Sequence, residues 1–578
     1  MTIEIIQTMM SSIPLELVIL AEIGIIIIIA TIFAFLIRLF KQPLIPAYII
    51  AGILIGPLVL GLIQNKELVL ALSEIGVAFL IFTAGLEIKF KKLREVGKAA
   101  FFGGIFQIAI LFFIAFLITV ALGFTGKIPI YVGLVVAFSS TMVVVKLLSD
   151  KRELNSLHGR IVIGILLIQD IVAIGALAAL TTDLSMGNIL IALGKASIFA
   201  IMAIVLSKIS NPIFKSSAKN QELLLLVSVS FLFLFAIGSY LANLSLIIGA
   251  FFAGVALANS DYKTEIQGKI TPLREFFAVI FFVSLGMQLR LISGRFILLF
   301  VILFALVILI KPLIIMFLIR ISGYKKRTSF LTGNSLAQTS EFSLILIVLG
   351  LNLGHFGTNP EITNGLFSTL VLLTIVTMAL TNYCIKYEKK SFKIFGWVLN
   401  ILDRYHSKKE DLEYHAPNGK KIIIFGCHRM GSLLLKDFEA EKKDIFVVDY
   451  NPEIIKSLIS KKIPCIYGDF MNPEVLEKAD IKNAEIIVST IPDFEENILL
   501  TDKIRAVNKN ALIFIVAERI DEAIELYKQG ANYVILPNVL SGQKTFDVIK
   551  KIKRDKKQLR NLKKEQIKYL NSIHNILY

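Results

Sequence analysis

The sequence predicts a polytopic α-helical membrane protein that continues into a C-terminal α/β domain. Of its 578 residues, 56% are hydrophobic and only 18% are charged, whereas soluble proteins average about 45 to 50% apolar residues. Apolar segments of the length that crosses a bilayer, roughly 20 residues, recur from Leu17 to Lys386. From Tyr387 onward, charged residues increase and short apolar runs alternate with helical patterns, which is typical of a soluble α/β domain.

The chain is expected to have four parts. A membrane domain is predicted at residues 1–387, a linker at 388–418, a Rossmann-like nucleotide-binding domain at 419–540 and a basic helical tail at 541–578. The tail is expected to be a solvated helix, with contact to lipid or to a partner subunit as the alternative. The N-terminus lacks the basic region and the cleavage site of a signal peptide, so the first apolar run should be a retained helix.

The membrane domain is expected to contain about 13 helices. Their centres are predicted near residues 27, 53, 78, 110, 139, 170, 198, 230, 250, 280, 307, 340 and 375.

Lysine and arginine concentrate in alternate loops, at 38–41, 89–98, 151–160, 208–219, 263–274 and 320–327. Short loops rich in these residues stay in the cytoplasm. We therefore expect a cell-membrane (inner-membrane) protein with its N-terminus outside and its C-terminal domain in the cytoplasm. Much of the net charge of +17 then lies in cytoplasmic loops that face anionic lipid head groups. Because the lipid surface explains this charge, nucleic acid is not expected as a partner.

The odd helix count permits two six-helix halves of opposite orientation around a linking helix, the inverted-repeat plan of many secondary transporters. The fifth span contains the polar run Phe138 to Thr141, and the twelfth contains Ala337 to Glu341. If each helix breaks there, freed carbonyl and hydroxyl groups face one another near the membrane midplane. An ion is expected to bind at this place.

Asp170 lies midway along the sixth span, and no charged residue of its own span is placed to pair with it. A desolvated carboxylate can exchange a proton for a dehydrated cation, so one side chain can couple two ions by competition. The alternative is a satisfied structural aspartate. Further oxygen ligands are expected from Gln169, Ser139, Ser140 and Thr141, although the hydroxyl residues also suit close helix packing.

Lys311 lies inside the eleventh span, where a buried lysine usually pairs with a carboxylate or loses its charge. The sequence does not identify its partner. Gln338 and Glu341 stand at the second break and are expected in or beside the ion site. The other membrane carboxylates are Glu22, Glu74 and Glu222, of which Glu74 and Glu222 are expected near span ends.

The C-terminal domain opens with a strand, Lys420 to Phe425, followed by a glycine-rich turn and an amphipathic helix from Ser432. The turn consists of Gly426, Cys427, His428, Arg429, Met430 and Gly431. The next strand ends in Asp449, about 20 residues on, where a Rossmann unit places its ribose-binding carboxylate.

His428 replaces the middle glycine of the turn, which normally lets the backbone approach a pyrophosphate. We therefore expect an adenine mononucleotide, AMP or ATP. NAD or NADH and an unliganded structural unit are the alternatives. No residues for hydride transfer are evident, and the three cysteines, Cys384, Cys427 and Cys465, show neither metal-ligand spacing nor a disulfide framework.

The chain resembles the monovalent cation:proton antiporter-2 family, especially Kef-type potassium efflux transporters with a C-terminal RCK (TrkA-N) domain. The resemblance runs nearly end to end. It is carried by Ala51 to Pro57, Glu74 to Gly76, Phe82 to Glu87, Phe138 to Thr141, Gly159-Arg160, Gln169-Asp170, Gly249 to Ala258, Phe281 to Met287 and Gln338 to Phe342.

The resemblance implies an NhaA/NapA-like homodimer in which a mobile core bundle moves beside a dimerisation bundle. It also implies elevator-type exchange of K+ or Na+ for H+ at Asp170, and the Gln169-Asp170 pair resembles the electroneutral branch. The RCK domain would restrain the transporter through a nucleotide bound at Gly426, Gly431, Asp449 and Asp469. Kef-type proteins carry an acidic regulatory segment where this chain has the basic segment Tyr262 to Lys269, which argues against glutathione regulation.

Two other functions remain as alternatives to K+/H+ exchange and its close rival, Na+/H+ exchange. A nucleotide-gated cation channel would need a selectivity filter, and no Thr-Val-Gly-Tyr-Gly loop is present. A membrane oxidoreductase would need a catalytic acid/base pair beside the glycine-rich turn, and none is evident. We therefore expect a transporter rather than an enzyme, with no bound metal other than the transported cation.

Overall fold

The computed structural model describes the chain in segments that form two compact units, and each unit is considered by itself. The described residues are 15–40, 42–63, 66–87, 98–151, 153–154, 157–181, 194–195, 197–199, 201–203, 205–206, 211–217, 220–242, 244–258, 260, 262–324, 326–388, 391–392, 413–414, 421–427, 429–438, 444–468, 470, 473–554, 562–564 and 566–567.

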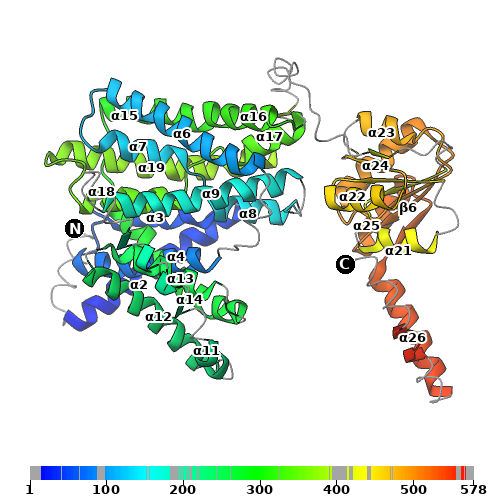
Figure 1. Ribbon diagram of the computed structural model, residues 1–578, viewed down its shortest axis with the longest axis horizontal. Coiled ribbons are helices and arrows are strands. Elements are labelled where there is room, and N and C mark those ends of the chain that lie inside the picture. The colour runs from blue at the N-terminus through cyan, green and yellow to red at the C-terminus, as the bar shows by residue number, and fades with distance from the viewer. Residues whose placement is uncertain are drawn as a thin grey trace. The chain divides into compact units, whose positions relative to one another are not determined.

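The first unit is helical (Figure 1). Its helices are α2 (Leu15–Leu39), α3 (Leu44–Ile55), α4 (Lys66–Glu87), α6 (Lys98–Ala121), α7 (Ile128–Ala137), α8 (Thr141–Asp150), α9 (Leu157–Leu180), α11 (Asn211–Ser217), α12 (Gln221–Leu241), α13 (Leu246–Leu257), α14 (Lys263–Gln288), α15 (Arg295–Ala305), the π-helical η1 (Leu306–Ile310), α16 (Lys311–Ile321), α17 (Lys326–Ser335), α18 (Glu341–Asn352) and α19 (Pro360–Lys386).

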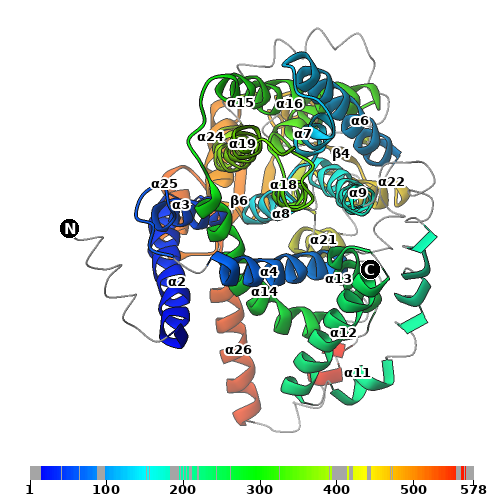
Figure 2. The ribbon, with the colours of Figure 1, turned by 90° about the vertical axis from the view of Figure 1, so that its left-hand side faces the viewer.

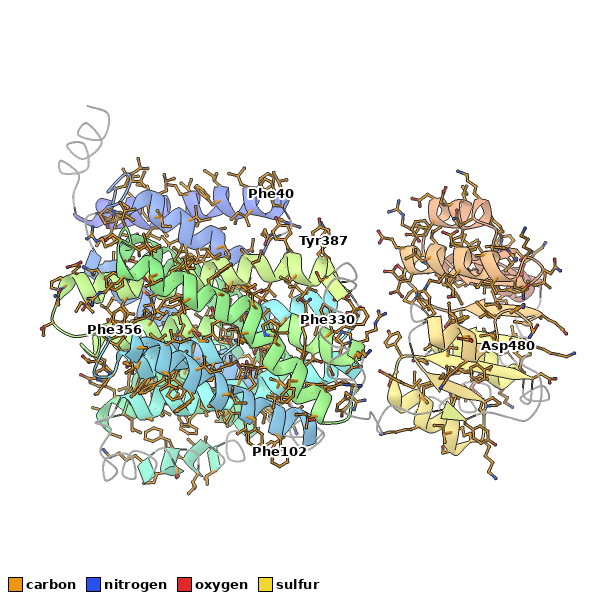
Figure 3. All side chains as sticks on the ribbon, turned by 90° about the horizontal axis from the view of Figure 1, so that it is seen from above. Phe40, Phe102, Phe330, Phe356, Tyr387 and Asp480 are labelled. Carbon is orange, nitrogen blue, oxygen red and sulfur yellow. The ribbon has the colours of Figure 1, made fainter. Side chains whose placement is uncertain are left out.

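Within the described residues, nine helical stretches are long and apolar enough to cross a membrane, and three shorter apolar helices accompany them. These twelve account for all the predicted span centres except the one near residue 198, which lies in a stretch that is described only in part. Large apolar side chains such as Phe40 and Phe102 point outward from the unit (Figure 3). Such a surface suits lipid and not water.

The helices of the membrane unit form two bundles (Figure 2). One bundle contains α2, α3, α4, α12, α13 and α14, and the other contains α6 to α9 and α15 to α19. The main contact recorded between the two bundles is that of α19 with α3. The packing therefore divides the unit into two bodies, and we call the second of them the core bundle.

Glycines let helices of the first bundle touch backbone to backbone, in two related places. A Cβ added at Gly52 of α3 would lie 2.1 Å from a backbone oxygen of α14, and one at Gly254 of α13 would lie 2.0 Å from a backbone oxygen of α4. Gly52 and Gly254 hold the same position in their helices, and so do their partners, Gly286 of α14 and Gly85 of α4. This repeated contact supports the predicted inverted-repeat plan.

The predicted breaks in the fifth and twelfth spans are confirmed. The first separates α7 from α8 at residues 138–140, and the second separates α17 from α18 at residues 336–340. Each new helix begins behind a serine: Ser140 accepts from the Val143 N–H at 3.3 Å, and Ser340 accepts from the Phe342 N–H at 3.1 Å. Serine at this position satisfies backbone donors that a helix start leaves unpaired.

A histidine ties the two broken spans together at the end where α7 begins. His355, which follows α18, lies 2.8 Å from Lys127 Nζ through its Nε2 atom and 2.8 Å from Tyr131 Oη through its Nδ1 atom. An ammonium group can only donate, so Nε2 must accept and the imidazole is neutral, with its proton on Nδ1. No sequence pattern indicated this contact.

The second unit is built on a seven-stranded sheet of order β1-β4-β3-β2-β5-β6-β7, parallel except for β1. Its strands are β1 (Glu413–Tyr414), β2 (Ile422–Phe425), β3 (Ile445–Asp449), β4 (Cys465–Tyr467), β5 (Ile486–Ser489), β6 (Leu512–Val516) and β7 (Tyr533–Ile535). Its helices are α21 (Arg429–Asp437), α22 (Pro452–Ser460), α23 (Pro473–Ala479), α24 (Phe494–Val507), α25 (Ile520–Lys528) and α26 (Pro537–Arg554).

The sheet has an apolar cluster on each face, as expected of a doubly covered parallel sheet. Strand β2 lies between β3 and β5, so the strand order reverses at β2 and β5. Ligands of such sheets bind beyond the carboxyl ends of the strands at this point. Strand β1 belongs to the sheet although it lies within the segment that was expected to be a linker.

Replacing Gly52 by alanine should destabilise the membrane unit by about 1 to 3 kcal/mol, because the added carbon has no space against α14. The control is Gly24→Ala in α2, where no atom lies within 4 Å of the added carbon. Thermal unfolding of the protein in detergent measures both. A Gly52→Ala midpoint equal to that of Gly24→Ala would contradict the proposed close contact.

Candidate ion-binding site

Lys311 holds the two broken spans at their crossing. Its side chain is fully buried, and its Nζ donates to the carbonyl oxygens of Val136 at 3.0 Å, Phe138 at 2.8 Å and Gln338 at 2.6 Å. A helix break leaves carbonyl groups without intrahelical partners, and an ammonium group has three protons to offer. The partner that the sequence left open is therefore a set of backbone carbonyls and not a carboxylate.

Side chains add further links between the two breaks. Gln338 Nε2 donates to the Ser140 carbonyl at 3.3 Å, and Ser139 Oγ donates to the Leu336 carbonyl at 3.0 Å. Ser343 Oγ, in the first turn of α18, donates to the Val135 carbonyl at 3.0 Å. The polar groups of the breaks are thus satisfied mainly by each other, as backbone at membrane depth requires.

Asp170 lies on α9 against the start of α8. Its two carboxylate oxygens accept from Thr141 Oγ1 at 3.1 and 3.0 Å. Thr141 is the first residue of α8, and the partial positive charge of a helix N-terminus favours an anionic group nearby. The Asp170 side chain is only partly covered, unlike that of its buried neighbour Gln169. This combination gives a partly buried carboxylate that is held in place at a helix break.

Gln169 makes a different contact from the one expected. Its Oε1 accepts from the Ser139 N–H at 2.8 Å, so this oxygen supports the first break and does not point toward a cation beside Asp170. The second break has an equivalent contact, because the Thr339 N–H lies 3.3 Å from Thr377 Oγ1 of α19. Thr377 was not predicted, since a threonine inside an apolar helix carries no distinguishing pattern.

Several buried polar atoms around the breaks have no hydrogen-bond partner within the described part of the chain. They are Gln107 Oε1, Gln169 Nε2, Gln338 Oε1 and Glu341 Oε2. Buried polar atoms are normally paired with protein, water or an ion, and leaving one unpaired costs about 1 to 3 kcal/mol. Four such atoms at one crossing indicate a polar site. Gln107, on α6, was not predicted, and its Nε2 lies 3.5 Å from the Ala137 carbonyl.

Glu341 is the first residue of α18 and is buried, close enough to Asp170 for the two carboxyl groups to repel one another when both are charged. The structure thus places it beside the site. Of the other membrane carboxylates, Glu222 lies at the start of α12 as expected, whereas Glu74 lies well inside α4 and not near its end. Glu22 is buried in α2.

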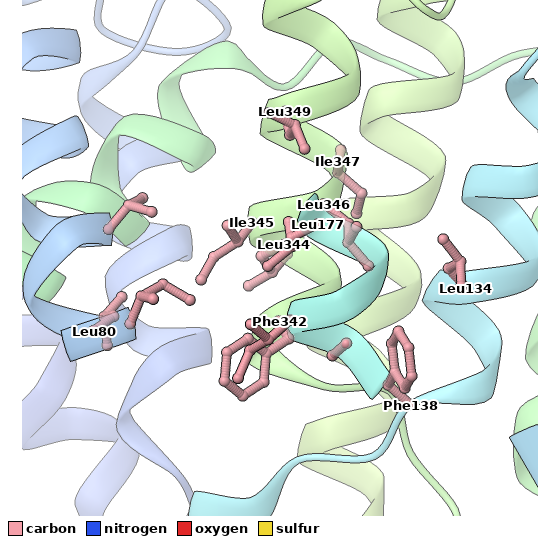
Figure 4. Packing of buried hydrophobic residues seen from close by; sticks show 14 of the residues in the cluster. Leu80, Leu134, Phe138, Leu177, Phe342, Leu344, Ile345, Leu346, Ile347 and Leu349 are labelled. Carbon is pink, nitrogen blue, oxygen red and sulfur yellow. The ribbon is translucent and has the colours of Figure 1, made fainter. Parts of the chain in front are cut away.

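The two bundles meet near the breaks through apolar side chains. Leu80 of α4 lies on one side, and Phe342 and Ile345 of α18 lie on the other, within a single buried cluster (Figure 4). Apolar contacts are not directional. The surface between the bundles therefore differs from the crossing itself, where directional hydrogen bonds link the two breaks.

The second unit carries the glycine-rich turn between β2 and α21, at the point where the strand order reverses. Gly426 has φ of +83°, a conformation that other residues rarely adopt. A Cβ added at Gly431 would lie 2.2 Å from the Gly426 carbonyl oxygen, and Thr490 Oγ1, after β5, donates to that same oxygen at 2.8 Å. The turn is therefore compact, with the start of α21 packed tightly on the strand.

Asp449 braces this turn from the end of β3. Its Oδ2 accepts from the Cys427 N–H at 2.6 Å, and its Oδ1 accepts from the Asn451 N–H at 2.7 Å. A carboxylate expected to bind ribose is thus engaged with backbone in this structure. Met430 lies in the first turn of α21. His428, Asp469 and the side chain of Arg429 lie outside the part of the chain that is described.

Two broken membrane helices that cross beside a carboxylate, followed by a Rossmann-like unit, define a secondary transporter with a soluble domain. Comparison with known families agrees. The family described as "Sodium/hydrogen exchanger, transmembrane" matches residues 24–386, and the family described as "TrkA-N domain" matches residues 422–537. The chain belongs to the sodium/hydrogen exchanger family. It is a multi-pass membrane protein of a transporter family and not an enzyme.

Related proteins match along most of the chain. The putative cation/proton antiporter YbaL of Escherichia coli (strain K12) is 30% identical over 515 residues, which cover 85% of this chain and 89% of that protein. The glutathione-regulated potassium-efflux system protein KefC of Escherichia coli O45:K1 is 27% identical over 499 residues, covering 84% and 77%. The sodium proton antiporter MjNhaP1 of Methanocaldococcus jannaschii has a similar fold, with a TM-score of 0.51 and 16% identity over 66% of this chain and 98% of that one.

The thiols beside the glycine-rich turn should be unreactive in the folded protein. Burial raises the pKa of Cys427 to about 12 and that of Cys465 to about 11. Alkylation requires the thiolate, so at pH 7.5 both should react roughly a hundredfold or more slowly than ordinary cysteines, and faster as the pH rises. Iodoacetamide labelling followed by mass spectrometry measures this, with urea-unfolded protein as the control. Rapid labelling of folded protein at pH 7.5 would contradict the predicted burial.

Proposed function

We propose that this protein exchanges a monovalent cation, K+ in the first place, for a proton at Asp170. The observation that carries the proposal is the partly accessible Asp170 carboxylate, fixed by two contacts from Thr141 at the start of a broken helix. When Asp170 is ionised, it attracts a cation; when protonated, it releases it. The core bundle moves along its apolar contact with the first bundle and carries either a cation or a proton from one side of the membrane to the other. This is elevator-type exchange.

The site favours electroneutral exchange. Lys311, the buried cation nearest the breaks, is engaged by three carbonyl oxygens and not by Asp170. One carboxylate can then carry one cation or one proton, but not both together. Oxygen ligands for the cation are proposed from Thr141, Ser140 and Glu341. Gln169, Ser139, Gln338 and Lys311 are proposed to position the breaks.

K+ is placed before Na+ because KefC is named as a potassium-efflux protein, and KefC matches along most of this chain. Na+/H+ exchange is the alternative, since MjNhaP1 is named as a sodium proton antiporter. The choice between the two ions depends on cavity size and ligand field. The exchange assay below distinguishes them directly.

We further propose that an adenine nucleotide, AMP or ATP before NAD or NADH, binds at Gly426 to Gly431 and regulates exchange. The compact turn at the reversal of strand order supports this, since such turns hold phosphates against a helix N-terminus. The domain limits given above, a homodimer and a cytoplasmic C-terminal domain belong to the same proposal.

Glutathione regulation, which the name of KefC records for that protein, is not proposed here. The segment Tyr262 to Lys269 is basic, and two of its side chains form hydrogen bonds within the membrane unit. Gln267 Nε2 donates to Glu87 Oε1 at 3.3 Å, and Lys269 Nζ donates to Gln221 Oε1 at 2.6 Å. In the second unit, Cys427 and Cys465 are buried as well.

Asp170→Asn should abolish exchange while leaving the protein folded, because an amide cannot carry the proton. Proteoliposomes with an internal pH dye receive K+ or Na+ in turn, with the membrane potential clamped. The control is Glu222→Gln, an acid-to-amide change at an exposed position of α12, which should keep the wild-type rate. Cation-dependent proton movement that persists in Asp170→Asn would refute the proposed mechanism. If the wild-type protein shows no cation-dependent proton movement, the proposed function is refuted.

Asp449→Ala should weaken nucleotide binding at least tenfold, because it removes the carboxylate that braces the glycine-rich turn. Titration calorimetry with AMP, ATP and NADH in turn measures the change. The control is Glu485→Ala, which alters a surface carboxylate of the same unit. Equal affinity of the two variants would exclude Asp449 from the nucleotide site.

A further inference from the structure

Lys151 joins the helix that contacts Asp170 to the end of the membrane unit. It caps the C-terminus of α8, and its Nζ donates to the Ile385 carbonyl at 2.7 Å and pairs with Glu388 Oε1 at 2.8 Å. Ile385 lies in the last turn of α19, and Glu388 follows that helix by two residues. We call these three residues the α8–α19 clamp.

The clamp is a specific contact and not a surface ion pair. The Glu388 side chain is only 8% exposed and that of Lys151 28% exposed. Burial raises the pKa of Glu388, and Lys151 opposes that rise. Lys151 also donates to a carbonyl in the last turn of α19. Removing Lys151 would leave a covered carboxylate without this ion pair, which gives the contact its importance.

Other charged groups surround the clamp without replacing it. His158 of α9 lies 3.3 Å from Glu153 Oε2. Burial raises the pKa of Glu153, but its neighbours, His158 foremost and then Lys151 and Arg327, outweigh that effect, so the pKa falls. The ends of α8, α9, α17 and α19 thus meet in one charged network, in which Lys151 forms the ion pair with Glu388 beyond α19.

The clamp and the ion site lie at opposite ends of one short helix. Helix α8 runs from Thr141 to Asp150, a rod of about 15 Å. Thr141, at its first turn, holds both oxygens of Asp170. A short helix moves as a rigid piece, so a displacement of Lys151 displaces Thr141.

We propose that the α8–α19 clamp is the connection through which the C-terminal domain acts on the ion site. The chain passes from Glu388 into the segment that leads to β1 and the nucleotide-binding turn. A change in the hold of Glu388 on Lys151 is transmitted by α8 to Thr141 and Asp170. Lys151 is therefore a positioning residue. This inference rests on the proposed function and specifies its regulation.

The test uses full-length protein in proteoliposomes, with the exchange assay described above and with AMP, ATP and NADH added in turn. The variants are Lys151→Gln, Glu388→Gln and the charge exchange Lys151→Glu with Glu388→Lys. The matched control is Lys146→Gln, an exposed lysine five residues earlier on α8. Titration calorimetry and the elution profile establish that each variant binds nucleotide and is folded.

Lys151→Gln and Glu388→Gln should bind nucleotide with wild-type affinity and exchange ions without it at a rate within about twofold of wild type. In both, nucleotide should no longer change the rate, and the charge exchange should restore that response. The inference would be overturned if the exchange rate of Lys151→Gln responded to nucleotide as the wild-type rate does. It would also be overturned if the exchange rate of Lys151→Gln fell equally with and without nucleotide. Exchange by wild type that ignores all three nucleotides would overturn it too. Absence of wild-type exchange would instead count against the proposed function.

Discussion

The arrangement of the membrane unit depends on how the backbone groups freed by two helix breaks are satisfied. A helix that stops inside a bilayer exposes carbonyls that lipid cannot pair. Lys311 meets this requirement for both breaks at once, since its ammonium group binds carbonyls of the fifth and the twelfth spans. All three of these hydrogen bonds go to backbone carbonyls, so none of them goes to Asp170. The carboxylate of Asp170 is held instead by Thr141 at the start of α8.

The fifth span is held along its whole length within the core bundle. Tyr131 and Lys127 contact His355 at one end, Lys311 binds the break, and Lys151 binds the end of α19 at the other. These contacts are polar and directional, whereas the contact between the two bundles near the breaks is apolar. The core bundle is fixed internally by hydrogen bonds and contacts the first bundle through apolar side chains near the breaks. Such a bundle is suited to move as a unit, as the proposed elevator-type exchange requires.

In the second unit, too, a single side chain satisfies several backbone groups, in this case at the glycine-rich turn. Asp449 satisfies backbone donors of the glycine-rich turn and of the residues after β3, so the turn is shaped before any ligand arrives. Gly431 allows the helix to approach the strand, and Thr490, just after β5, donates to the Gly426 carbonyl and closes the turn. A preformed turn reduces the ordering cost of binding. Regulation would then depend on how this unit is linked to the membrane unit.

The sequence by itself determined the spans, the two breaks and the glycine-rich turn, because each is a local pattern of apolar length, polar interruption or glycine spacing. It also singled out Asp170 and Lys311, since charges inside apolar segments are conspicuous. Only the tertiary structure decided the partners: Lys311 binds carbonyls as far as 175 residues away, Gln169 turns its oxygen to the backbone, and Lys151 reaches Glu388. Such contacts depend on how distant helices pack, and local periodicity carries no information about that packing.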